Sequence, residues 1–337
     1  MIHRKESSSF ARSLWMIARL VIVVIIFILL IYLDVLDLAK VGKMIFRWWT
    51  GAAAIFFLTS VIISMFRWQI LLNAVGIQVG FKMVMRLSFI GYAFSTVIPG
   101  TVSGDIIKAY YIVKGLNNRR TAAATTIVMD RVLGLFTMLL TAAVAIGGAL
   151  LLETQLLQGS KQTNNLIFLG CIVISLAITM LIGFLICLSK RIRNSNFIKW
   201  ITTHPPGHRI INKLYSTIYS FREKKQFLLK AIVASFVGQL PLIIGMYFIG
   251  RAADETVLRL AHYLFLAPVA LILNAIPIGP GGMGSGEAFV ESLFMLFGSR
   301  NGGEVIAVFH IAFILFSVIG FFLYIKGKGN LRGNETA

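Results

Sequence analysis

The chain has 337 residues, of which 58% are hydrophobic and only 13% are charged. A soluble globular domain carries about 25% charged residues, and a disordered chain has low hydrophobicity, so the composition excludes both classes. The formal net charge is +19, because 32 Lys and Arg residues outnumber 13 Asp and Glu residues. The basic residues stand between long apolar runs, which favours a membrane topology over nucleic-acid binding.

Six apolar runs reach the roughly 20 residues that a membrane-spanning helix needs. We expect full spans at Leu14–Leu33, Trp48–Phe66, Val132–Leu152, Leu166–Leu188, Phe227–Ile249 and Val305–Ile325. The first run is too long for the apolar region of a signal peptide and has no cleavage site of small residues, so we expect a retained anchor. The predicted fold is all-α: a polytopic helical membrane protein with a single transmembrane domain over residues 1–337.

Two further apolar stretches are interrupted by proline and glycine. Leu87–Ile98 is too short to cross the membrane and ends at Pro99, and Leu260–Ile276 runs into a bend that begins at Pro277. We expect each stretch to be a broken or re-entrant helical element that turns back within the membrane. The two elements divide the spans into half-repeats at about 14–152 and 166–325, which form an inverted-topology repeat.

The basic residues predict the orientation of these spans. If the N-terminus is cytoplasmic and both broken elements return to their own side, 22 of the 32 Lys and Arg residues lie inside. The loop 189–226 is the most basic of the inside segments. We therefore expect a multi-pass protein of the cytoplasmic (inner) membrane with both termini in the cytoplasm. Full crossing by the second element is the alternative, and it would put the basic C-terminal tail outside.

The first bend combines helix-breaking residues with a pair of charges. Pro99 ends a helix, and Gly100 and Gly104 permit a tight turn. Asp105 and Lys108 are spaced i, i+3 on the helix that follows and can form an ion pair. Two interpretations stay open: a half-helix that faces a phosphate with a charged gate, or a kinked helix whose ion pair lies at the cytoplasmic surface.

The second bend has many backbone groups without helical partners, and in a membrane such groups must line a cavity or pack in protein. Glu287 and Glu291 are spaced i, i+4 on the following helix, and an unpaired acid in a membrane is energetically expensive. The alternative is a loop outside the membrane that exposes both acids to water. The bend residues are Pro277, Pro280, Gly281, Gly282 and Gly284.

Arg131 follows Asp130 directly before the expected span Val132–Leu152. Adjacent residues on a helix point about 100° apart, so these two need not pair with each other. Arg131 either reaches a lipid phosphate or the acids near the bends, or extends to the membrane interface. The predicted headgroup-binding residues are therefore Asp105, Lys108, Arg131, Glu287 and Glu291.

No motif for nucleotide or metal chemistry occurs in the sequence. There is no P-loop, and the residues between His204 and His208 include two prolines and a glycine, which rule out a helical zinc pair. Cys171 and Cys187 have no second pair with which to form a metal site. We expect no catalytic residues, no metal, no cofactor, no nucleic-acid partner and no enzymatic activity.

An ordered set of short motifs covers about residues 50 to 325. Its members are Arg67-Trp68, Leu71-Leu72, Pro99, Ser103-Gly104-Asp105, Arg131, Gly134, Pro277, Pro280-Gly281-Gly282, Gly284 and Glu287. In these motifs the sequence resembles the flippase-like membrane proteins of the lysylphosphatidylglycerol synthase transmembrane-region family. It departs from the family pattern at Asp130, where a Glu is expected before the arginine, and the shorter side chain weakens any pairing that depends on reach.

The resemblance implies a lipid translocase without an ATPase of its own, which moves a phospholipid or a polyprenyl-phosphate-linked lipid across the cytoplasmic membrane. Its expected partners are those membrane lipids. Only Lys326–Ala337 follows the last span, so we expect a stand-alone transporter without the soluble aminoacyl-transferase domain of the full synthase. The alternative is a membrane-embedded transferase, or a non-transporting partner of an enzyme such as a glycosyltransferase, in lipid-linked glycan or aminoacyl-lipid synthesis.

Overall fold

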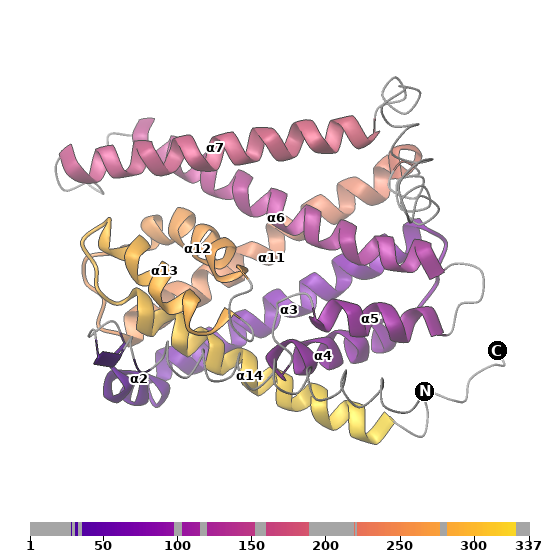
Figure 1. The fold of residues 1–337 in the computed structure, drawn as a ribbon, viewed down its shortest axis with the longest axis horizontal. Helices are drawn as coiled ribbons and strands as arrows, with labels where there is room; N and C mark the ends of the chain where they lie inside the picture. Colours follow the sequence, from indigo (N-terminus) through magenta and orange to yellow (C-terminus); the bar gives the residue numbers. More distant parts are fainter. Residues whose placement is uncertain are drawn as a thin grey trace, which may run out of the picture.

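The structure is a computed structural model that describes residues 28, 31–32, 36–97, 103–114, 120–151, 160–188, 219, 221–276 and 282–327. All regular secondary structure in these ranges is helical, and five of the helices are long and apolar enough to cross a membrane (Figure 1). They are α3 (Trp48–Ala74), α6 (Arg120–Leu151), α7 (Ser160–Leu188), α11 (Lys225–Ala252, preceded by the short 3-10 helix η1, Phe221–Lys224) and α14 (Gly302–Gly327).

These five helices coincide with five of the six expected spans, which confirms the prediction of an all-α polytopic membrane protein. The sixth, Leu14–Leu33, lies outside the described residues except at Ile28, Ile31 and Tyr32. Two helices are longer than their apolar runs. Helix α3 continues past Arg67, and α6 begins well before Asp130, so both charged residues lie within transmembrane helices rather than in loops.

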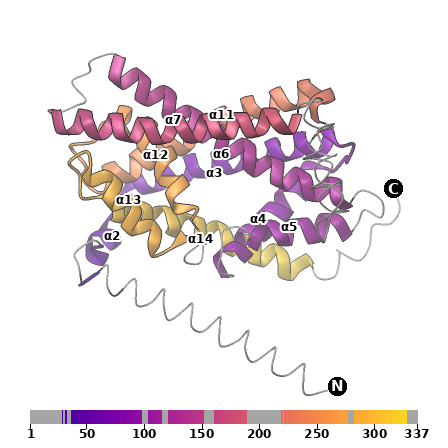
Figure 2. The same cartoon turned by 45° about the horizontal axis from the view of Figure 1, so that its top comes forward.

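Each broken element is a pair of helices packed against each other. The first hairpin consists of α4 (Phe81–Val97) and α5 (Ser103–Lys114), and the second of α12 (Leu260–Asn274) and α13 (Ser285–Met295). Figures 1 and 2 place the two hairpins at opposite ends of the long helices, the first on the right and the second on the left. Five expected bend residues lie outside the described residues: Pro99, Gly100, Pro277, Pro280 and Gly281.

The contacts between helices occur in matched pairs. At the centre, α3 and α11 pack along each other. Helix α4 of the first hairpin packs on α14, and α12 of the second hairpin packs on α6; likewise α5 packs on α6, and α13 on α14. Each hairpin thus contacts the last helix of both halves. An inverted-topology repeat predicts such matched contacts, and the repeat itself stays a prediction.

Glycines allow the hairpin helices to approach each other closely. A Cβ atom at Gly104 of α5 would lie 2.1 Å from the carbonyl oxygen of Gly91 of α4, and one at Gly286 of α13 would lie 2.2 Å from the side-chain oxygen of Asn274 of α12. The chain enters α13 through Gly282 and Gly284, whose φ angles of +89° and +87° are available mainly to glycine. Both hairpins are therefore held together by contacts that exclude larger residues.

Two helices lie at the periphery of this bundle. Helix α7 packs on α6, and much of its apolar surface is exposed, as is usual for a lipid-facing helix. The short helix α2 (Leu38–Ile45) begins after Asp37, whose carboxylate accepts hydrogen bonds from the N–H groups of Ala39 and Lys40. Neither helix contributes to the central cavity.

Candidate functional site

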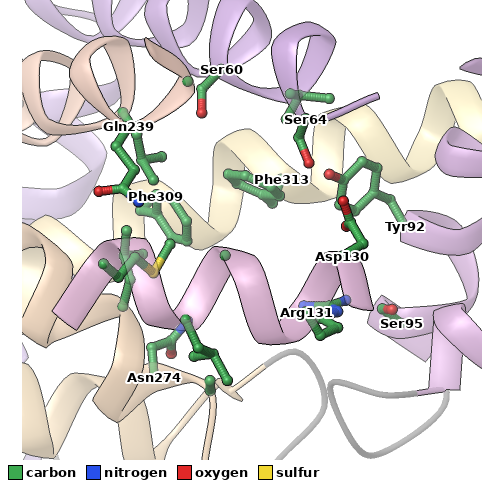
Figure 3. A pocket seen from close by; sticks show the side chains of 18 of the residues that line it. Ser60, Ser64, Tyr92, Ser95, Asp130, Arg131, Gln239, Asn274, Phe309 and Phe313 are labelled. Carbon is green, nitrogen blue, oxygen red and sulfur yellow. The ribbon is translucent and has the colours of Figure 1, made fainter. Parts of the chain in front are cut away.

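A cavity of about 310 Å³ lies where the two hairpins meet α3, α6, α11 and α14 (Figure 3). This volume is at the lower end of the roughly 300–1,000 Å³ of small-ligand sites, so the cavity has room for a small molecule or group rather than for a whole lipid. Its polar lining consists of Ser60, Ser64, Arg67, Tyr92, Ser95, Thr96, Lys108, Asp130, Arg131, Ser235, Gln239, Asn274, His310 and Ser317.

One wall of the cavity is a fixed ion pair between α3 and α6. Arg67 donates from Nε to Oδ1 of Asp130 at 2.7 Å and from Nη2 to Oδ2 at 3.0 Å. Its Nη1 donates to the hydroxyl of Ser235 on α11 at 3.1 Å. Gly134 makes room for this guanidinium, because a Cβ there would lie 3.3 Å from Nη1. With its charge balanced by Asp130, Arg67 serves mainly to hold three helices together.

A second ion pair joins the first hairpin to α6. Nε of Arg131 donates to Oδ2 of Asp105 at 2.6 Å, and Nζ of Lys108 lies 3.6 Å from Oδ1 of the same carboxylate. The Asp105–Lys108 pair therefore forms, and both of its side chains are largely buried within the protein. The Arg131 side chain is 54% exposed and lines the cavity, so its guanidinium offers donors to a ligand. Lys108 also lies 5.5 Å from the ring centroids of Trp68 and Tyr92.

A third polar group joins the second hairpin to α14. Oε2 of Glu287 accepts a hydrogen bond from the N–H of Gly284 at 2.6 Å, at the start of α13. Its Oε1 lies 2.9 Å from Nδ1 of His310, and Nε2 of His310 lies 3.0 Å from Oδ1 of Asn274. Glu287 is only 1% exposed, yet His310 and Asn274 both line the cavity. The imidazole of His310 therefore lies between the buried carboxylate of Glu287 and the cavity.

The structure separates the two glutamates that the sequence places on one helix face. Glu291 does not line the cavity; its Oε2 accepts a hydrogen bond from the N–H of Gly303 at 3.0 Å, in the first turn of α14. It is buried, so the contact substitutes for solvation of both groups. Of the five predicted binding residues, the structure places Lys108 and Arg131 in the cavity lining and Asp105 and Glu287 directly behind it.

The acid–base contacts follow the matched packing of the two halves. In each half, a Ser-Gly-acid sequence begins the second helix of the hairpin, and its acid contacts a basic side chain on the last helix of that half. The first pair is Asp105 with Arg131, and the second is Glu287 with His310. The two pairs share their framework but differ in the base.

Several residues of the site were not predicted from the sequence. They are Arg67 and Asp130 as a pair, and His310 and Asn274 as lining. One signal was present: His310 interrupts the last apolar run, and an ionisable residue within a span is a functional candidate. Within the described ranges, no group of three or more His, Cys, Asp or Glu residues could hold a metal ion.

The chain is similar to archaeal membrane proteins of the UPF0104 group. A UPF0104 membrane protein of Pyrococcus horikoshii is 24% identical over 326 residues, covering 85% of this chain and 94% of the relative. Another, from Methanothermobacter thermautotrophicus, is 24% identical over 256 residues, covering 72% of this chain and 73% of the relative. No solved structure gave a significant match. The family described as the lysylphosphatidylglycerol synthase TM region matches residues 16–323, and the chain belongs to this family of membrane proteins.

Proposed function

We propose that the protein is a lipid translocase, whose central cavity admits the phosphate-bearing headgroup of a phospholipid or polyprenyl-phosphate lipid while the apolar tails stay in the bilayer. The observation that carries this proposal is the half-exposed guanidinium of Arg131 in a cavity at the junction of two opposed hairpins. Broken helices at the centre of inverted repeats form substrate sites in many transporters. Guanidinium groups bind phosphate through paired hydrogen bonds.

The polar part of the lining supports a headgroup as an occupant of the cavity. Figure 3 shows Arg131 and Ser95 at one end of the cavity and the amides of Gln239 and Asn274 at the other, with Phe313 between them. Hydroxyl and amide groups along the path can replace the water that a headgroup loses on entering. Opening the cavity alternately past the first and the second hairpin would carry the headgroup across the membrane.

The proposed location is the cytoplasmic membrane, with both termini on the cytoplasmic side. The excess of Lys and Arg in the segments near the first hairpin supports this orientation. The proposed partners are anionic phospholipids or polyprenyl phosphates, and the proposed activity is transport without catalysis. In this orientation the first hairpin enters from the cytoplasm and the second from outside.

The test is translocation of fluorescent phosphatidylglycerol in proteoliposomes. After reconstitution, we expect dithionite to reach labelled lipid from the inner leaflet at a rate at least tenfold above that of empty liposomes. Arg131→Gln removes the guanidinium and is expected to lower the rate by tenfold or more, the cost of one lost charged hydrogen bond of about 1.5–3 kcal/mol.

The matched control is Arg47→Gln, because Arg47 pairs with Asp254 at an exposed helix start, away from the cavity. This variant is expected to translocate lipid like the wild type. Equal rates for wild-type protein and empty liposomes would overturn the proposal. A product formed from a labelled sugar donor, with no translocation, would favour the transferase alternative instead.

A further inference from the structure

The two acid–base pairs of the matched halves differ in one chemical property. Arginine keeps its charge at all physiological pH values, whereas histidine is the side chain that can bind or release a proton in that range. Both bases contact the acid that begins the second helix of their hairpin, at 2.6 Å and 2.9 Å. The second half therefore has a titratable base where the first half has a permanent cation.

The contacts of His310 suit two protonation states. Protonated imidazole donates from both nitrogens, and its two contacts, Oε1 of Glu287 and Oδ1 of Asn274, are both acceptors. Neutral imidazole has one donor and one acceptor, so the same contacts are kept if the Asn274 amide turns and donates from its nitrogen to Nε2. The charge of His310 can thus change without leaving a buried polar atom unpaired.

The charge balance of the cavity depends on this one proton. Glu287 is the only acid within hydrogen-bond distance of His310 among the described residues. The other charged or titratable groups of the cavity and its ion pairs come from α3, α4, α5 and α6, while α11 and α12 contribute neutral amides. Apart from His310, these groups are three cations (Arg67, Lys108 and Arg131), three acids (Asp105, Asp130 and Glu287) and the neutral phenol of Tyr92. The three positive and three negative charges cancel, so a proton on His310 gives the cavity and its ion pairs a net charge of +1.

We infer that His310, held by Glu287 and Asn274, is a proton-binding site that couples the movement of one proton to that of an anionic headgroup. This inference rests on the proposed translocase function. A headgroup with one negative charge enters a low-dielectric cavity more favourably when a proton on His310 balances it. The proton comes from water on the side where the headgroup enters and returns to water on the side where the headgroup leaves, so lipid and proton move in the same direction.

The experiment imposes a pH gradient on proteoliposomes that contain fluorescent phosphatidylglycerol in both leaflets. Wild-type protein is expected to move the labelled lipid toward the alkaline side, which shifts the dithionite-accessible fraction in opposite directions when the gradient is reversed. Trapped pyranine is expected to report proton movement that depends on the lipid. Without a gradient, the rate is expected to fall as the pH is raised on both sides, by no more than about tenfold per pH unit because a single proton is required.

Two variants isolate the imidazole. His310→Arg makes the second pair a copy of the first, and His310→Gln keeps a hydrogen-bonding side chain without a titratable proton. In both variants the dithionite-accessible fraction is expected to be the same for either direction of the gradient. Both are also expected to lose the pH dependence of the translocation rate. Thermal unfolding of each detergent-purified variant establishes that it is folded, and either folded variant is sufficient for the comparison.

The outcomes separate the two proposals. If the wild type translocates no lipid above the background of empty liposomes, the translocase proposal fails, and the coupling fails with it. If the wild type translocates lipid but the gradient produces no shift, or if a folded His310 variant shows the wild-type shift, only the proton coupling is overturned. Proton movement that does not depend on lipid would also overturn the coupling.

Discussion

The two hairpins have the same framework and different chemistry. In the first, the N–H of Gly104 donates to the hydroxyl of Ser95 at 3.1 Å, and in the second, Gly286 packs directly on the Asn274 amide. The features that they share, a glycine and an acid at the start of the second helix, are those that close packing and helix capping require. The features that differ, a hydroxyl against an amide and a guanidinium against an imidazole, belong to the cavity.

The hairpins also differ in how open their ion pairs are. The Arg131 side chain is 54% exposed, whereas that of His310 is 6% exposed. Arg131 of α6, which pairs with the first hairpin, therefore faces open space in the cavity. His310 of α14, which pairs with the second hairpin, is enclosed between that hairpin and its own helix. In this conformation Arg131 is therefore the more accessible of the two bases for a ligand in the cavity. Three sets of substitutions distinguish residues that are needed for packing from residues that act on a ligand in the cavity.

The largest expected effect comes from Gly104→Ala. The added Cβ would lie 2.1 Å from the carbonyl oxygen of Gly91, and a backbone oxygen cannot move aside without separating α4 from α5. We expect a loss of about 3 kcal/mol or more in the free energy of unfolding, at or above the upper end of typical overpacking costs. Thermal unfolding of the purified protein in detergent measures it.

Two other glycines are the controls for this change. Gly148→Ala has nothing within 4 Å of the added Cβ and is expected to leave stability unchanged or slightly higher. Gly286→Ala meets the side-chain oxygen of Asn274 rather than backbone, so a smaller loss is expected. A Gly104→Ala protein as stable as Gly148→Ala would show that the first hairpin is not held by this contact.

The next effect comes from opening the ion pair of the first hairpin. Asp105→Asn leaves Arg131 and Lys108 without their shared carboxylate, and we expect a loss of about 1–3 kcal/mol in stability. The double variant Asp105→Asn/Arg131→Gln removes one of the two uncompensated cations. Its loss in the free energy of unfolding is therefore expected to be smaller than the sum of the losses of the two single variants. Its translocation rate is nevertheless expected to stay at the Arg131→Gln level.

The double variant distinguishes a structural pair from a binding group. If translocation recovers along with stability, then Arg131 contributes only to packing, and the comparison between the two hairpins loses its functional meaning. If stability recovers and translocation does not, the guanidinium acts on the ligand. Proteoliposome rates and unfolding temperatures of the same preparations provide both measurements.

Hydropathy predicted the five described spans because burial in lipid requires long apolar runs. It ended the second span at Phe66 and began the third at Val132, because Arg67 and Asp130 are charged. The structure shows that these two residues, 63 positions apart in the sequence, form an ion pair. Each charge compensates the other, which lowers the cost of burying both within membrane-spanning helices. A single sequence carries no record of that pairing, and span limits drawn from hydropathy stop at such residues.

The candidate site was predictable where local sequence determines it. The i, i+3 spacing of Asp105 and Lys108 predicted their ion pair, and the glycine-rich bends marked the two hairpins. The sequence offered the acids near the bends as one possible partner of Arg131 but did not decide which acid, and it did not indicate His310. Both contacts arise only from the packing of α14 and α6. The sequence therefore indicated Asp105, Glu287, Lys108 and Arg131, and it left out the Arg67–Asp130 pair, His310 and Asn274.

The smallest expected effect separates Glu291 from Glu287. Glu291→Gln keeps a side-chain oxygen that can accept from the N–H of Gly303, so we expect a loss below about 1 kcal/mol in stability and an unchanged translocation rate. Glu287→Gln replaces a carboxylate that contacts both Gly284 and His310, and its effect on translocation is expected to be larger.

Because both residues are buried acids on one helix, burial alone predicts the same result for the two substitutions. Rates and unfolding temperatures of the two variants, measured side by side, decide between burial and position. A Glu291→Gln protein that is folded but inactive would place the second acid in the transport path. An unchanged rate for Glu291→Gln would restrict the function to Glu287, the acid whose partner His310 lines the cavity.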